Sequence, residues 1–189
     1  IIIMIQNPPD SYHAKFSGTL IQHQVKEQRQ NAIDGTCQKS TQSIYFFTNV
    51  IFGKNKVFDN IQQNSILIDM STISPHTSQE ITRKLKSKKS YILDCPVSGG
   101  EIGAINAELS IMVGGNEKIY KKIKHLLSCL GRNITYVGKS GSGQIAKACN
   151  QILVSQTIIA VSEILFLAKE TNTDPVLVQK ALMGGFAYS

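Results

Sequence analysis

Apolar runs alternate with amphipathic stretches through the middle of the chain, and this pattern predicts strands and helices in turn. Short apolar runs typical of strands occupy Ile66–Ser71, Ser90–Asp94, Leu109–Val113 and Ile134–Val137. Ser74 is expected to cap a helix that begins at Pro75 and runs to about Lys88, and Glu117–Leu130 carries its apolar residues on one side. Strands that alternate with helices predict an α/β layer with a largely parallel sheet.

The N-terminal part of the chain has a weaker pattern. Ile1–Ile5 is an unbroken apolar run, which predicts a buried parallel strand, and Asn7–Asp10 ends it as a loop. Lys15–Asn49 is polar and shows no sustained period, with a short helix predicted at Lys26–Asn31 and a short strand at Ser43–Phe47. We therefore expect residues 15–49 to be an atypical insertion that packs poorly on the α/β core.

The C-terminal part of the chain is helical throughout. A helix is predicted to run unbroken from Gln144 to about Glu170, because no glycine or proline lies inside it. A second helix is expected to begin at Asp174-Pro175 and to end at Gly184-Gly185. The pattern therefore places a domain boundary near Lys139, with an α/β domain at 1–138 and the start of a helical domain at 139–189.

The long helix is apolar on several faces. Polar residues interrupt its apolar run Ile152–Ala168, so we expect a buried core helix rather than a membrane span. The breadth of its apolar surface predicts cover by its own domain and by a partner subunit.

The start of this helix carries candidate chemistry. Lys147 and Asn150 are three residues apart, so they share a face of the helix. Gly141 and Gly143 would allow a ligand to approach the backbone, and the first turn offers unpaired N–H groups to an anion. These residues predict a site for a carboxylate-bearing substrate. The alternative is that Lys147 is an ordinary solvated surface lysine.

A dinucleotide fingerprint at the same place is rejected. Gly141-x-Gly143-x-x-Ala146 fits the spacing G-x-G-x-x-A. That fingerprint requires a second strand about 20 residues further on that ends in an acidic residue. Here the chain continues as helix through Ala168, and Glu163 lies in the middle of it.

Composition narrows the function classes. The chain has 189 residues, 42% of them hydrophobic, and a formal net charge of +7. Its densest lysine group, residues 84–89, has no interleaved aromatic residues, so nucleic-acid binding is not expected. Neither the four cysteines nor the four histidines are spaced as metal ligands or disulfide frameworks, so we expect no metal and a reducing compartment. We expect a cytoplasmic protein, or a mitochondrial one in a eukaryote.

Four motifs in order resemble one known family. They are Ile68–Pro75, Asp94–Gly100, Leu109–Gly115 and Gly141-x-Gly143-x-x-x-Lys147-x-x-Asn150. Together they resemble the β-hydroxyacid dehydrogenase family. The resemblance implies a partial Rossmann-like parallel sheet followed by the start of an all-helical domain, with NAD or NADP as cofactor. It also implies a small hydroxy or aldehyde acid as substrate, no membrane partner, and a homo-oligomer at full length.

The resemblance also implies roles for single residues. Lys147 matches the catalytic acid/base, and Asn150 matches an asparagine that holds the substrate. Ser98, Gly99 and Gly100 match the site of the substrate's carboxylate. Without the resemblance, that glycine segment would equally be an ordinary strand-to-loop turn.

Two further positions are implied to contact the cofactor. Thr72 matches a position beside the nicotinamide, and Pro8 lies in the loop after the first apolar run. Without the resemblance, Thr72 would be read as a simple helix-start residue.

Within the family, Glu101–Ile105 and Met183–Ala187 favour the branch that reduces tartronate semialdehyde, with the 3-hydroxyisobutyrate branch as the near alternative. The chain departs from the family pattern in three ways. The opening strand with its G-x-G-x-x-G loop is absent from the sequence, residues 15–49 have no expected counterpart, and the sequence stops at Ser189 before a further family lysine. A second hypothesis is therefore a non-catalytic chain that cannot hold the cofactor and acts as an interaction module.

Overall fold

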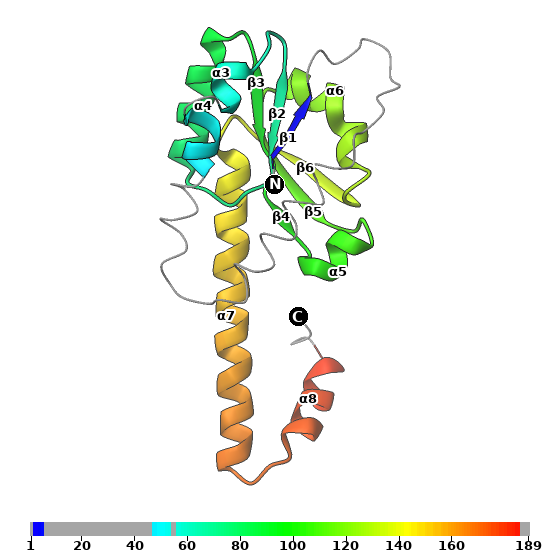
Figure 1. Cartoon of the computed structure of the whole chain (residues 1–189). Coiled ribbons are helices and arrows are strands. Elements are labelled where there is room, and N and C mark those ends of the chain that lie inside the picture. Colours follow the sequence, from blue (N-terminus) through cyan, green and yellow to red (C-terminus); the bar gives the residue numbers. More distant parts are fainter. Residues whose placement is uncertain (1, 6–46, 54–55, 186–189) are drawn as a thin grey trace. The chain divides into compact units, whose positions relative to one another are not determined.

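The computed structural model describes residues 2–5, 47–53 and 56–185, without the side chains of residues 2–5 (Figure 1). The chain divides into two compact units, with the division between Lys147 and Ala148. The first unit contains the sheet and its helices, and the second contains most of α7 (Ser142–Glu170) and α8 (Pro175–Met183). Two sequence predictions lie outside the described part. They are most of the expected insertion, residues 15–46, and the predicted cofactor residue Pro8.

The first unit is built on a six-stranded sheet, counted over the described residues. Five strands lie in the order β1-β2-β3-β5-β4, and β6 pairs with β5. Their bounds are β1 Ile2–Ile5, β2 Ile66–Asp69, β3 Tyr91–Asp94, β4 Val97–Ser98, β5 Ser110–Gly115 and β6 Asn133–Gly138. The pairs β2–β3 and β5–β6 are parallel, as the strand–helix alternation predicted. The α/β, Rossmann-like class is therefore confirmed.

Three details of the sheet differ from expectation. Strand β3 pairs antiparallel with β5, with Leu93 opposite Gly115, although the alternation predicted a largely parallel sheet. Strand β1 runs antiparallel to β2, with Ile2 opposite Asp69, because an apolar run indicates burial but not strand direction. The segment around Ser98–Gly100, which the sequence would equally make a strand-to-loop turn, contains strand β4, which pairs antiparallel with β5. The helix α5 (Gly100–Ile105) then begins inside that segment.

Two helices of the first unit begin at residues whose side chains cap them. Helix α4 (Pro75–Ser87) is capped by Ser74, whose Oγ accepts a hydrogen bond from the Thr77 N–H at 3.0 Å. Helix α6 (Glu117–Leu127) is capped by Asn116, which accepts from the N–H groups of Lys118 and Ile119. A shorter helix, α3, occupies Val57–Asn60.

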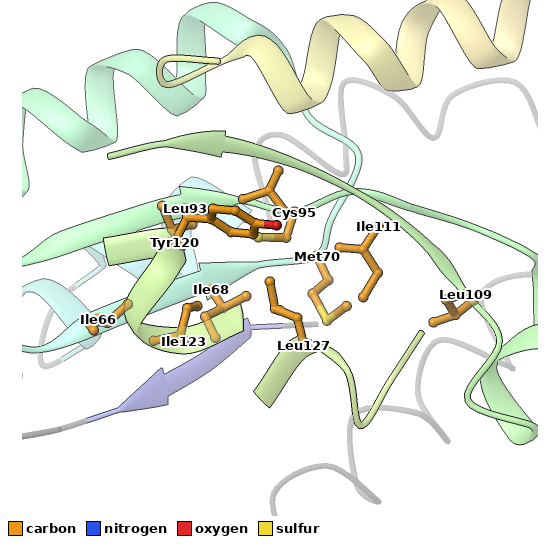
Figure 2. Packing of buried hydrophobic residues seen from close by; sticks show 11 residues of the cluster. Ile66, Ile68, Met70, Leu93, Cys95, Leu109, Ile111, Tyr120, Ile123 and Leu127 are labelled. Carbon is orange, nitrogen blue, oxygen red and sulfur yellow. The ribbon is translucent and has the colours of Figure 1, made fainter. Parts of the chain in front are cut away.

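Hydrophobic residues pack on both faces of the sheet, since neighbouring residues of a strand point to opposite faces. One face packs against α6, as Figure 2 shows; its buried cluster is Ile66, Ile68, Met70, Leu93, Cys95, Leu109, Ile111, Val113, Tyr120, Ile123 and Leu127. The other face presents Leu67 and Ile92 to Ile81 and Leu85 of α4.

Residues 47–52 are helical, and Phe47 and Ile51 belong to this second cluster. Phe47 is buried there, although the sequence pattern placed it at the end of a strand. The residues of that predicted strand before Phe47 lie outside the described part.

Helix α7 is unbroken from Ser142 to Glu170, which confirms the predicted helix. Its later turns are not buried among the described residues: Leu153 is 70% exposed and Phe166 65%, contrary to the expected core helix. The pattern identified an apolar helix, but burial also needs neighbours to cover it. Within the described part, α7 is the one helix long and apolar enough to cross a membrane, a property it shares with core helices of soluble proteins.

Candidate active site

The start of α7 is fixed to the end of β3 by a carboxylate of the protein itself. Asp94 Oδ1 accepts a hydrogen bond from the Gly141 N–H at 2.9 Å, and its Oδ2 accepts from the Gln144 N–H at 3.2 Å. The sequence suggested that these N–H groups would receive an anionic ligand. That interpretation is wrong, because Asp94 occupies donors at this helix end. The same two hydrogen bonds from Gly141 and Gln144 to Asp94 support the rejection of the dinucleotide fingerprint.

Glycines at two positions allow this close contact. A Cβ at Gly143 would lie 2.5 Å from the Met112 carbonyl oxygen and 2.6 Å from that of Asp94. A Cβ at Gly114 would lie 2.5 Å from Asp94 Oδ2. The glycine at 143 therefore brings the helix against the strands, whereas the sequence suggested that it would admit a ligand.

Burial changes the pKa values of two carboxyl groups at the ends of β2 and β3. It raises the pKa of Asp94, although the hydrogen bonds from Gly141 and Gln144 oppose the rise. Burial also raises the pKa of Asp69, at the end of β2, to about 7 despite the hydrogen bond from Ser71. Within the described part, Asp69 Oδ2 has no hydrogen-bond partner. Two buried carboxyl groups with raised pKa values therefore lie at the ends of neighbouring strands.

Gln144 connects α7 to the loop that follows β2. Its Oε1 accepts a hydrogen bond from the Ile73 N–H at 3.1 Å, and its Nε2 donates to the Ser71 carbonyl at 2.8 Å. Thr72, the predicted cofactor residue, lies between these two bonded residues and is exposed. The structure thus brings the Thr72 loop to the first turn of α7.

Lys147 follows Gln144 by three residues on α7 and is partly buried. Desolvation lowers the pKa of its ammonium, which makes it a better proton donor near neutral pH. No salt bridge to Lys147 is formed among the described residues. Asn150 lies on the same helix, and its Nδ2 donates to Gln151 Oε1 at 2.9 Å. Both residues are thus on the predicted helix.

The predicted carboxylate site lies at the end of β4. Ser98 is paired with Ser110 of β5. Gly99 and Gly100 follow with φ values of 135° and 63°, which favour glycine, and both are exposed. Met112 of β5 ties this segment to α7, because its N–H donates to the Pro96 carbonyl and its own carbonyl contacts Gly143.

Sequence reasoning missed Asp94 and Gln144. Asp94 carried a usable signal, since an acidic residue ended a buried strand at an edge where ligands and helix starts gather. Gln144 carried none, because a glutamine inside a helical pattern reads as an ordinary helix former.

Comparisons with known proteins extend this picture. Residues 42–138 match the family described as the NAD binding domain of 6-phosphogluconate dehydrogenase. Residues 141–189 match the NAD-binding domain of NADP-dependent 3-hydroxyisobutyrate dehydrogenase. The 2-hydroxy-3-oxopropionate reductase of Escherichia coli (strain K12) is 47% identical over 140 residues, which cover 74% of this chain and 48% of that protein. The chain belongs to the β-hydroxyacid dehydrogenase family.

Other members are also similar. The probable mitochondrial 3-hydroxyisobutyrate dehydrogenase of Dictyostelium discoideum is 42% identical, over 67% of this chain and 40% of that protein. The crystal structure of 3-hydroxyisobutyrate dehydrogenase from Salmonella typhimurium has a TM-score of 0.68 at 26% identity, over 77% of this chain and 51% of that one. This chain therefore spans about half the length of the relatives it matches. The first family match begins at residue 42, so the family counterpart starts before Asn49.

The cofactor of this family is NAD or NADP. The described residues fit the nicotinamide end of such a molecule. The loop after β2 exposes Thr72 at the carboxyl end of the strand, where cofactors of such sheets lie. They do not fit a pyrophosphate at the start of α7, because Asp94 accepts the N–H groups of Gly141 and Gln144 there.

Proposed function

We propose that the protein, at the full length of its relatives, is an NAD(P)-dependent reductase that converts tartronate semialdehyde to glycerate. The proposal is supported by the similarity to the Escherichia coli reductase, which is higher than that to the Dictyostelium dehydrogenase. The observation that carries it is the position of Lys147, a partly desolvated ammonium on a helix start that Asp94 and Gln144 fix to the ends of β2 and β3.

In this proposal, Lys147 is the general acid. The cofactor supplies the hydride that reduces the aldehyde carbon. As the carbonyl oxygen becomes negative, the Lys147 ammonium stabilises it and transfers a proton to it from Nζ. Asn150 hydrogen-bonds the substrate, and the segment Ser98–Gly100 receives its carboxylate through a hydroxyl and backbone N–H groups. Thr72 orients the nicotinamide end of the cofactor.

The test compares Lys147→Ala with wild type in the full-length enzyme. We expect turnover of tartronate semialdehyde to fall by about 10²–10⁴-fold, the usual contribution of general acid catalysis, with little change in cofactor affinity. Lys147→Arg should restore little, because a guanidinium does not release its proton. Near-normal turnover of Lys147→Ala, with both tartronate semialdehyde and methylmalonate semialdehyde, would return Lys147 to the role of a surface lysine.

A second candidate substrate is 3-hydroxyisobutyrate, because the Dictyostelium relative is named for it and covers two thirds of this chain. Measuring kcat/KM for both substrates with one enzyme preparation separates the two branches. The non-catalytic hypothesis is tested separately, by titrating the full-length protein with NADH and NADPH. Binding of either cofactor contradicts it.

We also propose that the full-length protein is a homo-oligomer that handles only small molecules. The exposed apolar side chains of α7 support an additional protein surface against this helix. Light scattering of the full-length protein tests the proposal, and a monodisperse monomer would contradict it.

A further inference from the structure

We propose that Gln144 is a positioning residue: its amide clamps the loop that carries Thr72 against the helix that carries Lys147. This inference rests on the function proposed above. It adds a residue that contacts neither substrate nor cofactor and acts through the two segments that it joins.

The clamp uses both ends of one primary amide. Oε1 accepts from Ile73 N–H and Nε2 donates to the Ser71 carbonyl, so the two bonds hold the backbone on either side of Thr72. The side chain of Gln144 is only 2% exposed. Buried hydrogen bonds of this kind are costly to leave unmade, so they fix the geometry of what they join.

Few other side chains could form this pair of bonds. The loop offers a donor and an acceptor two residues apart, which requires an acceptor and a donor on the same planar group. A glutamate lacks the donor, and an asparagine is one methylene shorter. A methionine has the length but neither a strong donor nor a strong acceptor.

The location of the clamp separates it from a purely structural hydrogen bond. Gln144 lies one turn before Lys147, and the loop it holds leaves the Thr72 side chain exposed. Hydride transfer and protonation must occur on one substrate molecule, so the cofactor-side loop and the lysine need a fixed separation. Misplacement by about 1 Å can cost about 10²-fold in rate.

Gln79 provides a matched control. This glutamine of α4 also forms a hydrogen bond with the segment just before α7, because its Nε2 donates to the Ser140 carbonyl at 3.4 Å. It is exposed and does not bond to the Thr72 loop. The comparison of Gln144→Met with Gln79→Met in the full-length enzyme therefore contrasts the loss of a buried bond pair to the Thr72 loop with the loss of an exposed bond to the segment before α7.

We expect Gln144→Met to lower kcat by about 10–100-fold and Gln79→Met to change it by less than about twofold. The deciding measurement is a double-mutant cycle with Lys147→Ala. If Gln144 acts by positioning Lys147, the effect of Gln144→Met on kcat should largely vanish in the Lys147→Ala background. A purely structural residue would lower kcat by the same factor in both backgrounds, or lower only the folded fraction measured by circular dichroism.

The outcomes separate this inference from the proposed function. If Lys147→Ala is impaired while Gln144→Met has normal kcat, the clamp is wrong and the function stands. If Lys147→Ala retains normal kcat, both are wrong. Should Gln144→Met fail to fold, Gln144→Glu, which keeps the acceptor for Ile73, replaces it in the same cycle. If neither variant folds, Gln144 is a structural residue and the inference is overturned.

Discussion

The first turns of α7 are held by buried polar contacts, whereas its later turns expose apolar side chains. At the start, Asp94 and Gln144 hold the backbone through buried hydrogen bonds, and Gly143 leaves no room for a Cβ against the carbonyl oxygens of Met112 and Asp94. Farther along, Leu153, Ile158 and Phe166 are each more than half exposed. Contacts within this chain therefore fix the start of α7, whereas no described residue buries these three apolar side chains of its later turns. Mutations should show the difference as strong, contact-specific effects at one end and weak ones at the other.

The largest effect is expected for Asp94→Ala. This change leaves the buried N–H groups of Gly141 and Gln144 without acceptors, which should lower the free energy of unfolding by about 2–5 kcal/mol. Asp174→Ala is the matched control, because Asp174 caps α8 through one exposed bond to Val176. Removing that cap should cost only about 0.5–2 kcal/mol. Urea denaturation measures both, and equal losses would show that the buried cap is not special.

Asp69 makes the anchored end sensitive to pH. Its folded-state pKa of about 7 exceeds the ordinary value of 3.8, so the folded chain keeps a proton that the unfolded chain loses. Its contribution to stability is complete below about pH 4 and is lost as the pH rises through 7. Asp69→Asn should remove this loss and stabilise the protein at pH 8 by on the order of 2–4 kcal/mol.

This prediction is checked by urea unfolding at pH 4.5 and pH 8. Asp174→Asn, which also removes one negative charge, serves as the control. If the unfolding free energy of the wild type does not decrease from pH 4.5 to pH 8, the assignment of a buried neutral Asp69 is contradicted.

Gly143→Ala should be destabilising although alanine normally favours a helix. The new Cβ meets backbone oxygens of Met112 and Asp94, which cannot move as flexible side chains can. Overpacking of this kind typically costs about 1–3 kcal/mol. Gly184→Ala is the control, because its nearest atom, the Ala181 oxygen, lies at 3.7 Å. Thermal unfolding compares them; a stabilised Gly143→Ala protein would mean that α7 is not pressed against the strands.

The smallest effect is expected at the exposed end. Phe166→Ser should change the unfolding free energy of this chain by less than about 0.5 kcal/mol, as surface substitutions do. In the full-length protein the same change should be more costly if other segments cover α7. Denaturation of both lengths measures the difference, and equal small effects would argue against cover at this position.

The sequence predicted what depends on neighbours in the chain. The Ser74 cap, the Pro75 helix start and the unbroken α7 follow from local chemistry, and the structure has all three. Lys147 lies on the predicted helix and Thr72 in the segment before α4, and the roles that the family motifs imply for them stay predictions. What it could not predict are contacts between residues far apart, such as Asp94 with Gly141 and Gln144 with Ser71. The direction of β1 and the exposure of α7 were missed for the same reason, since both depend on what lies beside them.

The long separation of the Asp94–Gly141 hydrogen bond has a consequence for the order of folding. These residues are 47 apart in the chain, and β4, α5, β5, α6 and β6 lie between them. Closing so long a loop is entropically costly until those elements have paired. We therefore expect the bond to form after the folding transition state, so that Asp94→Ala gives a φ-value near zero and accelerates unfolding rather than slowing folding. Stopped-flow kinetics can measure this, and a φ-value near one would contradict it. The proposed site around Lys147 would then be the last part of the sheet domain to form and the first to be lost.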